Sequence, residues 1–169
     1  MDSFEGSIGT PSGGFNLKVE YSYTQNIEEN YSDVTATAYV KRNNSSYSPY
    51  NNESTANLTI DGTNKNYTGS YDLRTGGYKI ITSNTVRVPH NSDGTKSITI
   101  SFSFNGKLSS YYPNGSISKE ITLTPIPRGS MRLKSNGAWK RGTPYVKVNG
   151  VWKKGTAYLK LNGTWKRGS

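Results

Sequence analysis

Residues 149–156 read Asn-Gly-Val-Trp-Lys-Lys-Gly-Thr, and nearly the same phrase stands at residues 136–143 and 162–169. The three copies follow one another at a spacing of 13 residues. They hold all three tryptophans of the chain in equivalent places, at Trp139, Trp152 and Trp165. A repeat at a fixed period indicates one structural unit that is presented several times.

Each copy carries an Asn-Gly dipeptide between two alternating, β-favouring runs; the dipeptides are Asn136-Gly137, Asn149-Gly150 and Asn162-Gly163. Asn-Gly favours a type I′ turn, in which both central residues have positive φ, and it is the strongest short-range signal of a hairpin. A two-residue loop fixes the register, which places Val148 opposite Val151 and Lys147 opposite Trp152. We therefore predict a short antiparallel β-meander of hairpin repeats over residues 128–169.

The predicted register gathers aromatic and basic residues on one face of each hairpin and mostly valines on the other. The aromatic and basic positions of the three copies, which we take as candidate ligand-binding residues, are Trp139, Trp152, Trp165, Tyr145, Tyr158, Lys134, Lys147 and Lys160. Packing into the core of a small sheet is the ordinary role of such aromatics and is favoured here. The functional alternative is a platform for a sugar ring or a cation. Because a lone hairpin is marginal in water, the repeats are expected to need the preceding domain or further copies of themselves.

The positive charge of the chain is confined to this region. Residues 128–169 contain eleven Lys and Arg and no Asp or Glu, whereas residues 1–127 contain ten basic and eleven acidic residues. A segregated charge indicates an anionic partner, for which nucleic acid, a phosphate-rich cell-wall polymer and an acidic protein face are all open. The plainer alternative is that Lys protects exposed strand edges from pairing with other chains.

The preceding 127 residues are rich in Gly, Ser, Thr, Asn and Tyr, and only 31% of the whole chain is hydrophobic. We expect an extended arm or an edge strand at residues 1–14 and a domain at residues 15–127. Its predicted strands are 15–23, 34–40, 56–60, 66–71, 78–81, 85–88, 96–104 and 117–123. Short strands at intervals of about ten residues predict an all-β fold, an immunoglobulin-like or jelly-roll β-sandwich. The clearest strand is 96–104, which places Ile98, Ile100, Phe102 and Phe104 on one face.

Residues for catalysis are scarce in this sequence. There is no cysteine and a single histidine, His90. Between Pro89 and the turn residues Asp93 and Gly94, His90 is expected to order the turn rather than to act as a base. No phosphate-binding loop or metal-ligand cluster is evident, so we predict no catalytic residues, no metal, no cofactor and no enzymatic activity. The first residues lack the pattern of a signal peptide, and no segment has the length of a membrane span.

The phrase Val-Pro-His-Asn-Ser-Asp-Gly-Thr at residues 88–95 and the Ile-Pro-Arg at residues 126–128 resemble a known family. The chain is similar to minor structural, tail-associated proteins of siphophages and prophages of Gram-positive bacteria. The Asn-Gly-x-Trp-Lys repeats also resemble modules appended to tail and fibre proteins. They differ in period from choline-binding repeats. The resemblance implies a virion component, made in the host cytoplasm and associated with other virion proteins.

Three functions are compatible with these patterns. The first is a host-surface adhesion module whose repeats bind a bacterial cell-wall polysaccharide or teichoic acid, with avidity from repetition. The second is a structural role in decorating capsid, neck or tail, or in forming a homo-oligomer such as a trimer. The third is nucleic-acid binding, with bases stacked on the tryptophans. It ranks last because the lysines lie on both hairpin faces.

Overall fold

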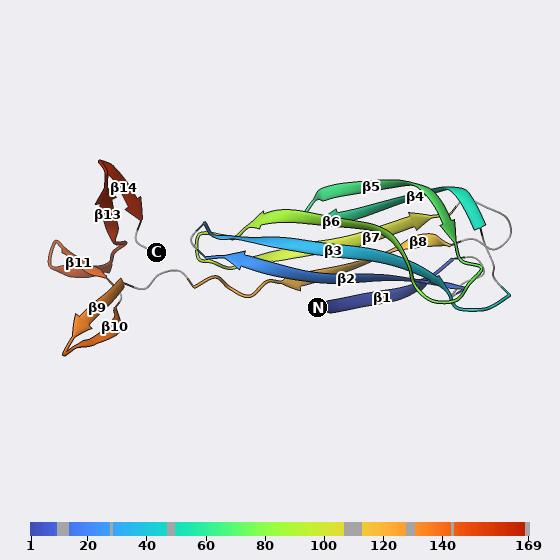
Figure 1. Ribbon diagram of the computed structural model, residues 1–169. Coiled ribbons are helices and arrows are strands. Elements are labelled where there is room, and N and C mark those ends of the chain that lie inside the picture. The colour runs from blue at the N-terminus through green and yellow to red at the C-terminus, as the bar shows by residue number, and fades with distance from the viewer. Residues whose placement is uncertain are drawn as a thin grey trace. The chain divides into compact units, whose positions relative to one another are not determined.

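The computed structural model describes residues 1–9, 14–27, 29–46, 50–106, 113–127, 131–142 and 144–167. Among these residues the regular structure is β-strand throughout, as the sequence predicts. The chain divides into two compact units, Met1–Pro125 and Ile126–Ser169. The first is the sandwich and the second holds the repeats (Figure 1).

The sandwich consists of two four-stranded antiparallel sheets. The first sheet has the order β1-β2-β3-β6, formed by β1 (Asp2–Ile8), β2 (Phe15–Asn26), β3 (Tyr31–Arg42) and β6 (Lys79–Pro89). The second has the order β5-β4-β7-β8, formed by β5 (Thr63–Asp72), β4 (Tyr50–Ile60), β7 (Ser97–Asn105) and β8 (Asn114–Thr122). Figure 1 shows the two layers lying one over the other.

The strand order selects the immunoglobulin-like alternative over the jelly roll. β3 pairs with β6 in one sheet and β4 pairs with β7 in the other, as strands B and E and strands C and F do in immunoglobulin-like domains. β5 extends the second sheet beside β4, in the place of strand C′, and β8 takes the place of strand G. A jelly roll is built instead from two Greek keys, whereas β1, β2 and β3 here follow one another as neighbours in a single sheet.

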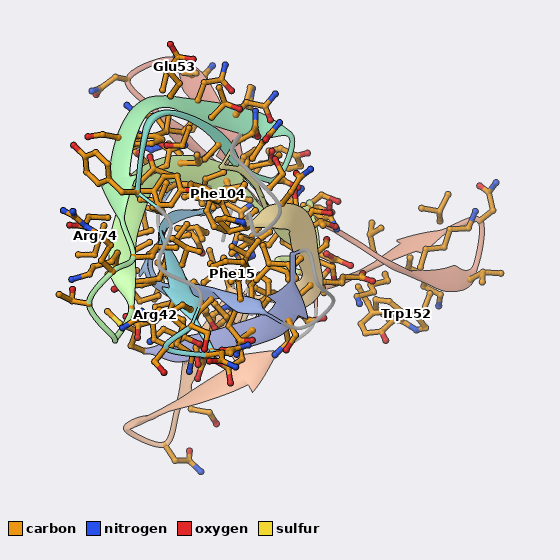
Figure 2. All side chains as sticks on the ribbon, turned by 90° about the vertical axis from the view of Figure 1, so that its right-hand side faces the viewer. Phe15, Arg42, Glu53, Arg74, Phe104 and Trp152 are labelled. Carbon is orange, nitrogen blue, oxygen red and sulfur yellow. The ribbon has the colours of Figure 1, made fainter. Side chains whose placement is uncertain are left out.

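The inner faces of the two sheets form the core because apolar residues alternate with polar ones along the strands. Phe15, Leu17 and Val19 on β2 are fully buried. On β7 the predicted inward face is confirmed, since Ile98, Ile100, Phe102 and Phe104 are all buried. Figure 2 shows Phe15 and Phe104 inside the sandwich.

The first strand lies within the region where we expected an arm or an edge strand. β1 forms the edge of the first sheet, with Ile8 paired to Phe15 and Asp2 to Tyr21. It also closes one side of the sandwich against β8, because a Cβ built on Gly6 would lie only 2.8 Å from the Ile117 side chain. The absence of a side chain at Gly6 therefore permits the two edges to approach.

Two strand assignments from the sequence are wrong. The runs at 78–81 and 85–88 are not separate strands, because residues 79–81 and 85–88 both belong to β6. The pairing of β6 with β3 shifts register between Ala38 and Tyr39. This irregularity leaves Ile81 and Thr82 both buried, so the alternation changes phase within one strand. β4 also begins at Tyr50, before the start of the strand predicted at 56–60.

His90 links the turn between β6 and β7 to strand β3. Its ring is buried, with Nδ1 2.7 Å from the carbonyl oxygen of Gly94 and Nε2 2.8 Å from the hydroxyl of Ser32. Because a carbonyl oxygen only accepts, Nδ1 donates to Gly94. Within the same turn, the Asp93 carboxylate accepts from the backbone N–H of Thr95 at 2.9 Å. The histidine therefore holds the β6–β7 turn and also ties it to β3.

The described residues of the second unit form three hairpins. They are formed by β9 (Met131–Ser135) with β10 (Ala138–Gly142), β11 (Tyr145–Val148) with β12 (Val151–Lys154), and β13 (Tyr158–Leu161) with β14 (Thr164–Arg167). Each turn has positive φ at both central residues, which is the requirement of a type I′ turn; the values are 51° and 78° at Asn136-Gly137, 50° and 83° at Asn149-Gly150, and 47° and 82° at Asn162-Gly163.

The hairpin repeats that we predicted over residues 128–169 are present, but the described residues do not join them into one continuous meander. Each pair of strands makes its own two-stranded sheet, with no ladder between β10 and β11 or between β12 and β13. The connections between hairpins are short and contain Pro144 and Gly155. Because Pro144 has no backbone N–H, it cannot continue a ladder from one hairpin into the next. Its carbonyl instead accepts from the N–H of Gly155 at 2.8 Å, which closes the second hairpin on itself.

The buried hydroxyl of Tyr71 allows a test of one hydrogen bond in the core. The hydroxyl donates to the carbonyl oxygen of Gly106 at 3.0 Å, and burial raises the pKa of Tyr71 to about 12. We expect Tyr71→Phe to lower the free energy of unfolding by about 1 kcal/mol at neutral pH, because a hydrogen bond is lost. In the unfolded chain the phenol ionises near its ordinary pKa of 10.0, so the native contribution of Tyr71 is lost as pH rises from about 10 to 12.

The difference between wild type and Tyr71→Phe should therefore shrink in alkaline solution. Urea denaturation of both proteins, at neutral pH and at pH ~11, measures it. A difference that stays constant over this range contradicts the assignment.

His90→Ala should destabilise the sandwich by about 1–3 kcal/mol, because it leaves the Gly94 carbonyl and the Ser32 hydroxyl without their partner. Ser32→Ala alone should lower the free energy of unfolding by less than His90→Ala does. The double variant should lose less than the sum of the two single losses, since the two residues share one contact. Chemical denaturation of the three variants measures this coupling. Strictly additive losses would show that the ring does not bond to Ser32.

Candidate functional site

The hairpin register brings Lys and Trp into direct opposition in every repeat. Lys147 pairs with Trp152 in the second hairpin, and Lys160 pairs with Trp165 in the third. The backbone of Lys134 pairs with that of Trp139 in the first hairpin; the side chains of these two lie outside the described part of the structure. The two-residue loop thus repeats one cross-strand pair three times.

The aromatic residues of the second and third hairpins are solvent-exposed. Trp152 and Trp165 are 64% and 65% exposed, and Tyr145 and Tyr158 are 59% and 55% exposed. The expectation that the tryptophans pack into a core of their own is therefore wrong for Trp152 and Trp165. The physical reason is that each hairpin is a separate two-stranded sheet, so no second layer of the described residues covers its face. Figure 2 shows the Trp152 side chain projecting from its hairpin.

Each exposed indole carries an ammonium group nearby. Lys147 Nζ lies 5.9 Å from the centroid of the Trp152 ring, and Lys160 Nζ lies 5.7 Å from that of Trp165. These distances lie near the outer limit of a cation–π contact, which is weak at an exposed site. Ring and cation therefore remain available together to a ligand. The face combines a flat apolar surface with positive charge, and Tyr145 and Lys154 pair at the base of the same face.

The opposite face of the second hairpin is also exposed. Val146, Val148 and Val151 are 51%, 41% and 61% exposed. A hairpin that buries neither face gains little from the hydrophobic effect. This ribbon therefore has an apolar face in addition to its cationic aromatic one.

Sequence reasoning missed an aromatic and charged cluster on the outer face of the first sheet. Lys18 Nζ lies 4.8 Å from the ring centroid of Tyr39 and 4.4 Å from that of Tyr78, and it donates to Glu20 at 2.7 Å. Tyr39 also donates to Glu20, at 2.7 Å. The hydrogen bond from Lys18 lowers the pKa of Glu20, followed by that from Tyr39.

This cluster satisfies itself, which argues against a binding role. The hydroxyl of Tyr78 donates to Glu5, and burial raises the pKa of Tyr78 to about 12. Its cation, carboxylates and phenols are therefore committed to one another and hold β1, β2, β3 and the residue before β6 together. The sequence does place Lys18 and Glu20 on the same face of β2, since they stand at alternate positions. It does not indicate that Tyr78 joins them, because Tyr78 lies about sixty residues further along the chain.

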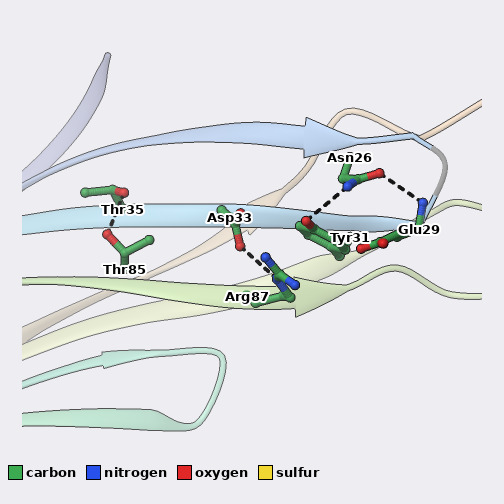
Figure 3. A network of polar contacts seen from close by, with 7 residues as sticks. All are labelled: Asn26, Glu29, Tyr31, Asp33, Thr35, Thr85 and Arg87. Carbon is green, nitrogen blue, oxygen red and sulfur yellow. Dashed lines mark hydrogen bonds and ion pairs between the residues drawn. The ribbon is translucent and has the colours of Figure 1, made fainter.

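A second polar network lies on β3 and β6 and is drawn in Figure 3. Arg87 donates to Asp33 at 3.2 Å and lies 3.8 Å from the ring centroid of Tyr31. The hydroxyls of Thr35 and Thr85 bond to each other at 2.8 Å. These are cross-strand pairs that stabilise the sheet. Like the cluster around Lys18 and Tyr78, these residues bond mainly to one another and leave few free groups for a ligand.

Within the described ranges, no group of three His, Cys, Asp or Glu residues gathers in a way that could hold a metal ion. The described residues include no helix of the length and apolar character needed to cross a membrane. The strongest candidate site is therefore the cationic aromatic face of the hairpins.

No curated protein and no solved structure matches the chain. A protein-family model does match, over residues 11–144, and its description is siphovirus protein of unknown function (DUF859). The matched range takes in most of the sandwich and the first hairpin, while the second and third hairpins lie beyond it. Because the match spans well over half of the 169 residues, the chain belongs to this family of siphovirus proteins.

Proposed function

We propose that this protein is a non-enzymatic virion component, tail-associated and active at the surface of a Gram-positive host, whose hairpin repeats bind an anionic cell-wall glycopolymer. The observation that carries the proposal is the exposure of Trp152 and Trp165, each with a lysine ammonium within 6 Å of its ring. Family membership supports a phage structural role. The adhesive role rests on the hairpin face.

The chemistry of that face matches a phosphate-bearing glycan such as a teichoic acid. An indole ring offers a flat apolar surface to the C–H face of a sugar, and a lysine beside it offers charge to a phosphate. The repeat region contributes eleven basic residues and no acidic ones, so a polyanion meets attraction along the whole segment. An uncharged polymer could contact the indole rings but would gain nothing from the lysines.

Repetition compensates for the weakness of each contact. An exposed cation–aromatic contact contributes about 0.5–1 kcal/mol. A polymer that engages several hairpins at once binds more tightly than one hairpin does, because each further contact is intramolecular. The 13-residue period therefore serves a polymeric ligand better than a small one.

The second candidate function is structural: association of the hairpins with copies of this chain, such as a trimer, or with another virion protein. The observation in its favour is the exposed valine face of Val146, Val148 and Val151. The two roles are compatible because they use opposite faces of the same ribbon. Nucleic-acid binding ranks third, since Lys153 lies on the valine face, away from Trp152.

A matched pair of lysine variants tests the proposal in the full chain. Lys147→Ala with Lys160→Ala removes the two lysines that pair with the tryptophans, while Lys153→Ala with Lys166→Ala removes equal charge at the alternate register positions. We expect the first pair to weaken retention on purified Gram-positive cell walls by roughly 10-fold, because each site loses a contact and avidity falls with both. The second pair should weaken it much less.

The tryptophan variant Trp152→Ala with Trp165→Ala should reproduce the loss without changing charge. Co-sedimentation of each variant with cell walls, before and after chemical removal of teichoic acid, measures the effect. Equal losses from the two lysine pairs would attribute binding to net charge alone. Unchanged binding by the tryptophan variant would remove the hairpin face from the mechanism, and a preference for single-stranded DNA in a gel shift would favour the third function.

A further inference from the structure

A groove of about 520 Å³ lies on the outer face of the second sheet, in the sandwich and not in the hairpins. It crosses all four strands of this sheet. One row of its lining is Thr68, Thr55, Asn105 and Asn114, which are paired in register from β5 to β8. A second row is Asn66, Asn57, Ser103 and Ser116. The two rows present only hydroxyl and amide side chains.

The groove differs from the outer face of the first sheet in lacking charge. None of its lining residues is Asp, Glu, Lys, Arg or His. The outer face of the first sheet, in contrast, carries Lys18, Glu20, Asp33 and Arg87. A ligand of the groove is therefore recognised by neutral hydrogen bonds and gains nothing from carrying charge.

Part of the lining is held in place before any ligand arrives. Asn57 Nδ2 donates to Asn66 Oδ1 at 2.6 Å, and Thr59 Oγ1 donates to Asn57 Oδ1 at 2.8 Å. These bonds fix the orientation of both amides and leave Asn66 Nδ2 as a donor. Fixed polar groups lower the entropy that a ligand loses on binding.

Other polar groups of the lining have no partner within the protein. In the described part of the chain, the side chains of Thr55, Thr68, Ser103, Asn114 and Ser116 make no hydrogen bond. On the first sheet the equivalent hydroxyls pair with each other, as Thr37 does with Ser83 at 3.0 Å. The groove thus gathers unused donors and acceptors in one hollow.

We propose that this groove binds a neutral saccharide. Hydroxyl and amide groups each donate and accept, which is the hydrogen-bonding capacity that sugar hydroxyls require. Four strands at a spacing of about 4.8 Å make the groove roughly 14 Å long, enough for a short oligosaccharide. Each contact is exposed to water, so binding is weak for a single sugar and increases with the number of units in the groove.

This site is independent of the hairpins. It lies in the other compact unit and requires no positive charge. The protein would then have two kinds of carbohydrate contact, a neutral one on the sandwich and an anionic one on the repeats. Loss of either leaves the other in place.

The test is an NMR titration of the full chain with neutral oligosaccharides of glucose, galactose and N-acetylglucosamine. We expect at least one of them to shift the backbone amide signals of β4, β7 and β8 around Ser103. Ser103→Arg, which fills the middle of the groove, should weaken that binding at least ~10-fold, because a guanidinium displaces the sugar and breaks several hydrogen bonds. Ser22→Arg, the same change at an exposed position of β2, should leave it unchanged.

Ser116→Ala provides a milder variant, expected to weaken binding by a few fold through the loss of one hydroxyl. The proposal is overturned if none of the three oligosaccharides shifts the groove signals, if the shifts fall on residues 131–167 instead, or if Ser103→Arg and Ser22→Arg bind alike. A response to a neutral Gly-Ser peptide without a response to any sugar would also overturn it. A missing response at the groove leaves the hairpin proposal intact, because that proposal concerns a charged polymer and the probes are uncharged. Shifts on residues 131–167 would instead show that the hairpins also bind neutral sugars.

Discussion

The strict alternation of inward and outward side chains is the constraint on which this structure depends. A strand whose alternate residues are apolar can bury one face, and two such faces make the core of the sandwich. Phe15 and Phe104 lie on the inner faces of opposite sheets and are both almost fully buried. Because the inner faces supply the stability, the outer faces are free to carry groups that contribute little to it. The groove occupies such an outer face on the second sheet.

The hairpins follow the same alternation without a second layer. Here a two-residue Asn-Gly turn, and not a core, sets which residues face each other. The turn places Lys147 opposite Trp152 and Val148 opposite Val151, and both faces stay exposed. A segment of this kind can vary its surface residues without affecting a core, provided that the turn is kept. The same freedom makes its apolar groups available to a partner.

Local signals in the sequence were enough to predict the parts of the fold that depend on neighbouring residues. The hairpin register and the buried face of Ile98 to Phe104 follow from residues close in the chain. The phase change at Ile81 could not be predicted, because it arises from pairing with β3, about forty residues earlier. The prediction of a meander was wrong for a related reason. Alternation identifies strands but does not show which strands pair. The two rows of the groove cross four strands, so the sequence shows only scattered Ser, Thr and Asn and does not predict that they come together.

Whether polar groups are satisfied separates the surfaces that stabilise this protein from those that can bind. Lys18, Glu20 and Tyr39 bond to one another, so a ligand would have to break those contacts before making its own. Within the described part of the chain Ser103 and Ser116 make no such contacts, and Lys147 lies at the outer limit of its contact with Trp152. A ligand at these positions gains hydrogen bonds or charge pairing at little internal cost. An aromatic, charged cluster whose groups bond to one another, as Lys18, Glu20 and Tyr39 do, is therefore weaker evidence of a site than a row of unpaired hydroxyls or an indole with a loosely held ammonium group.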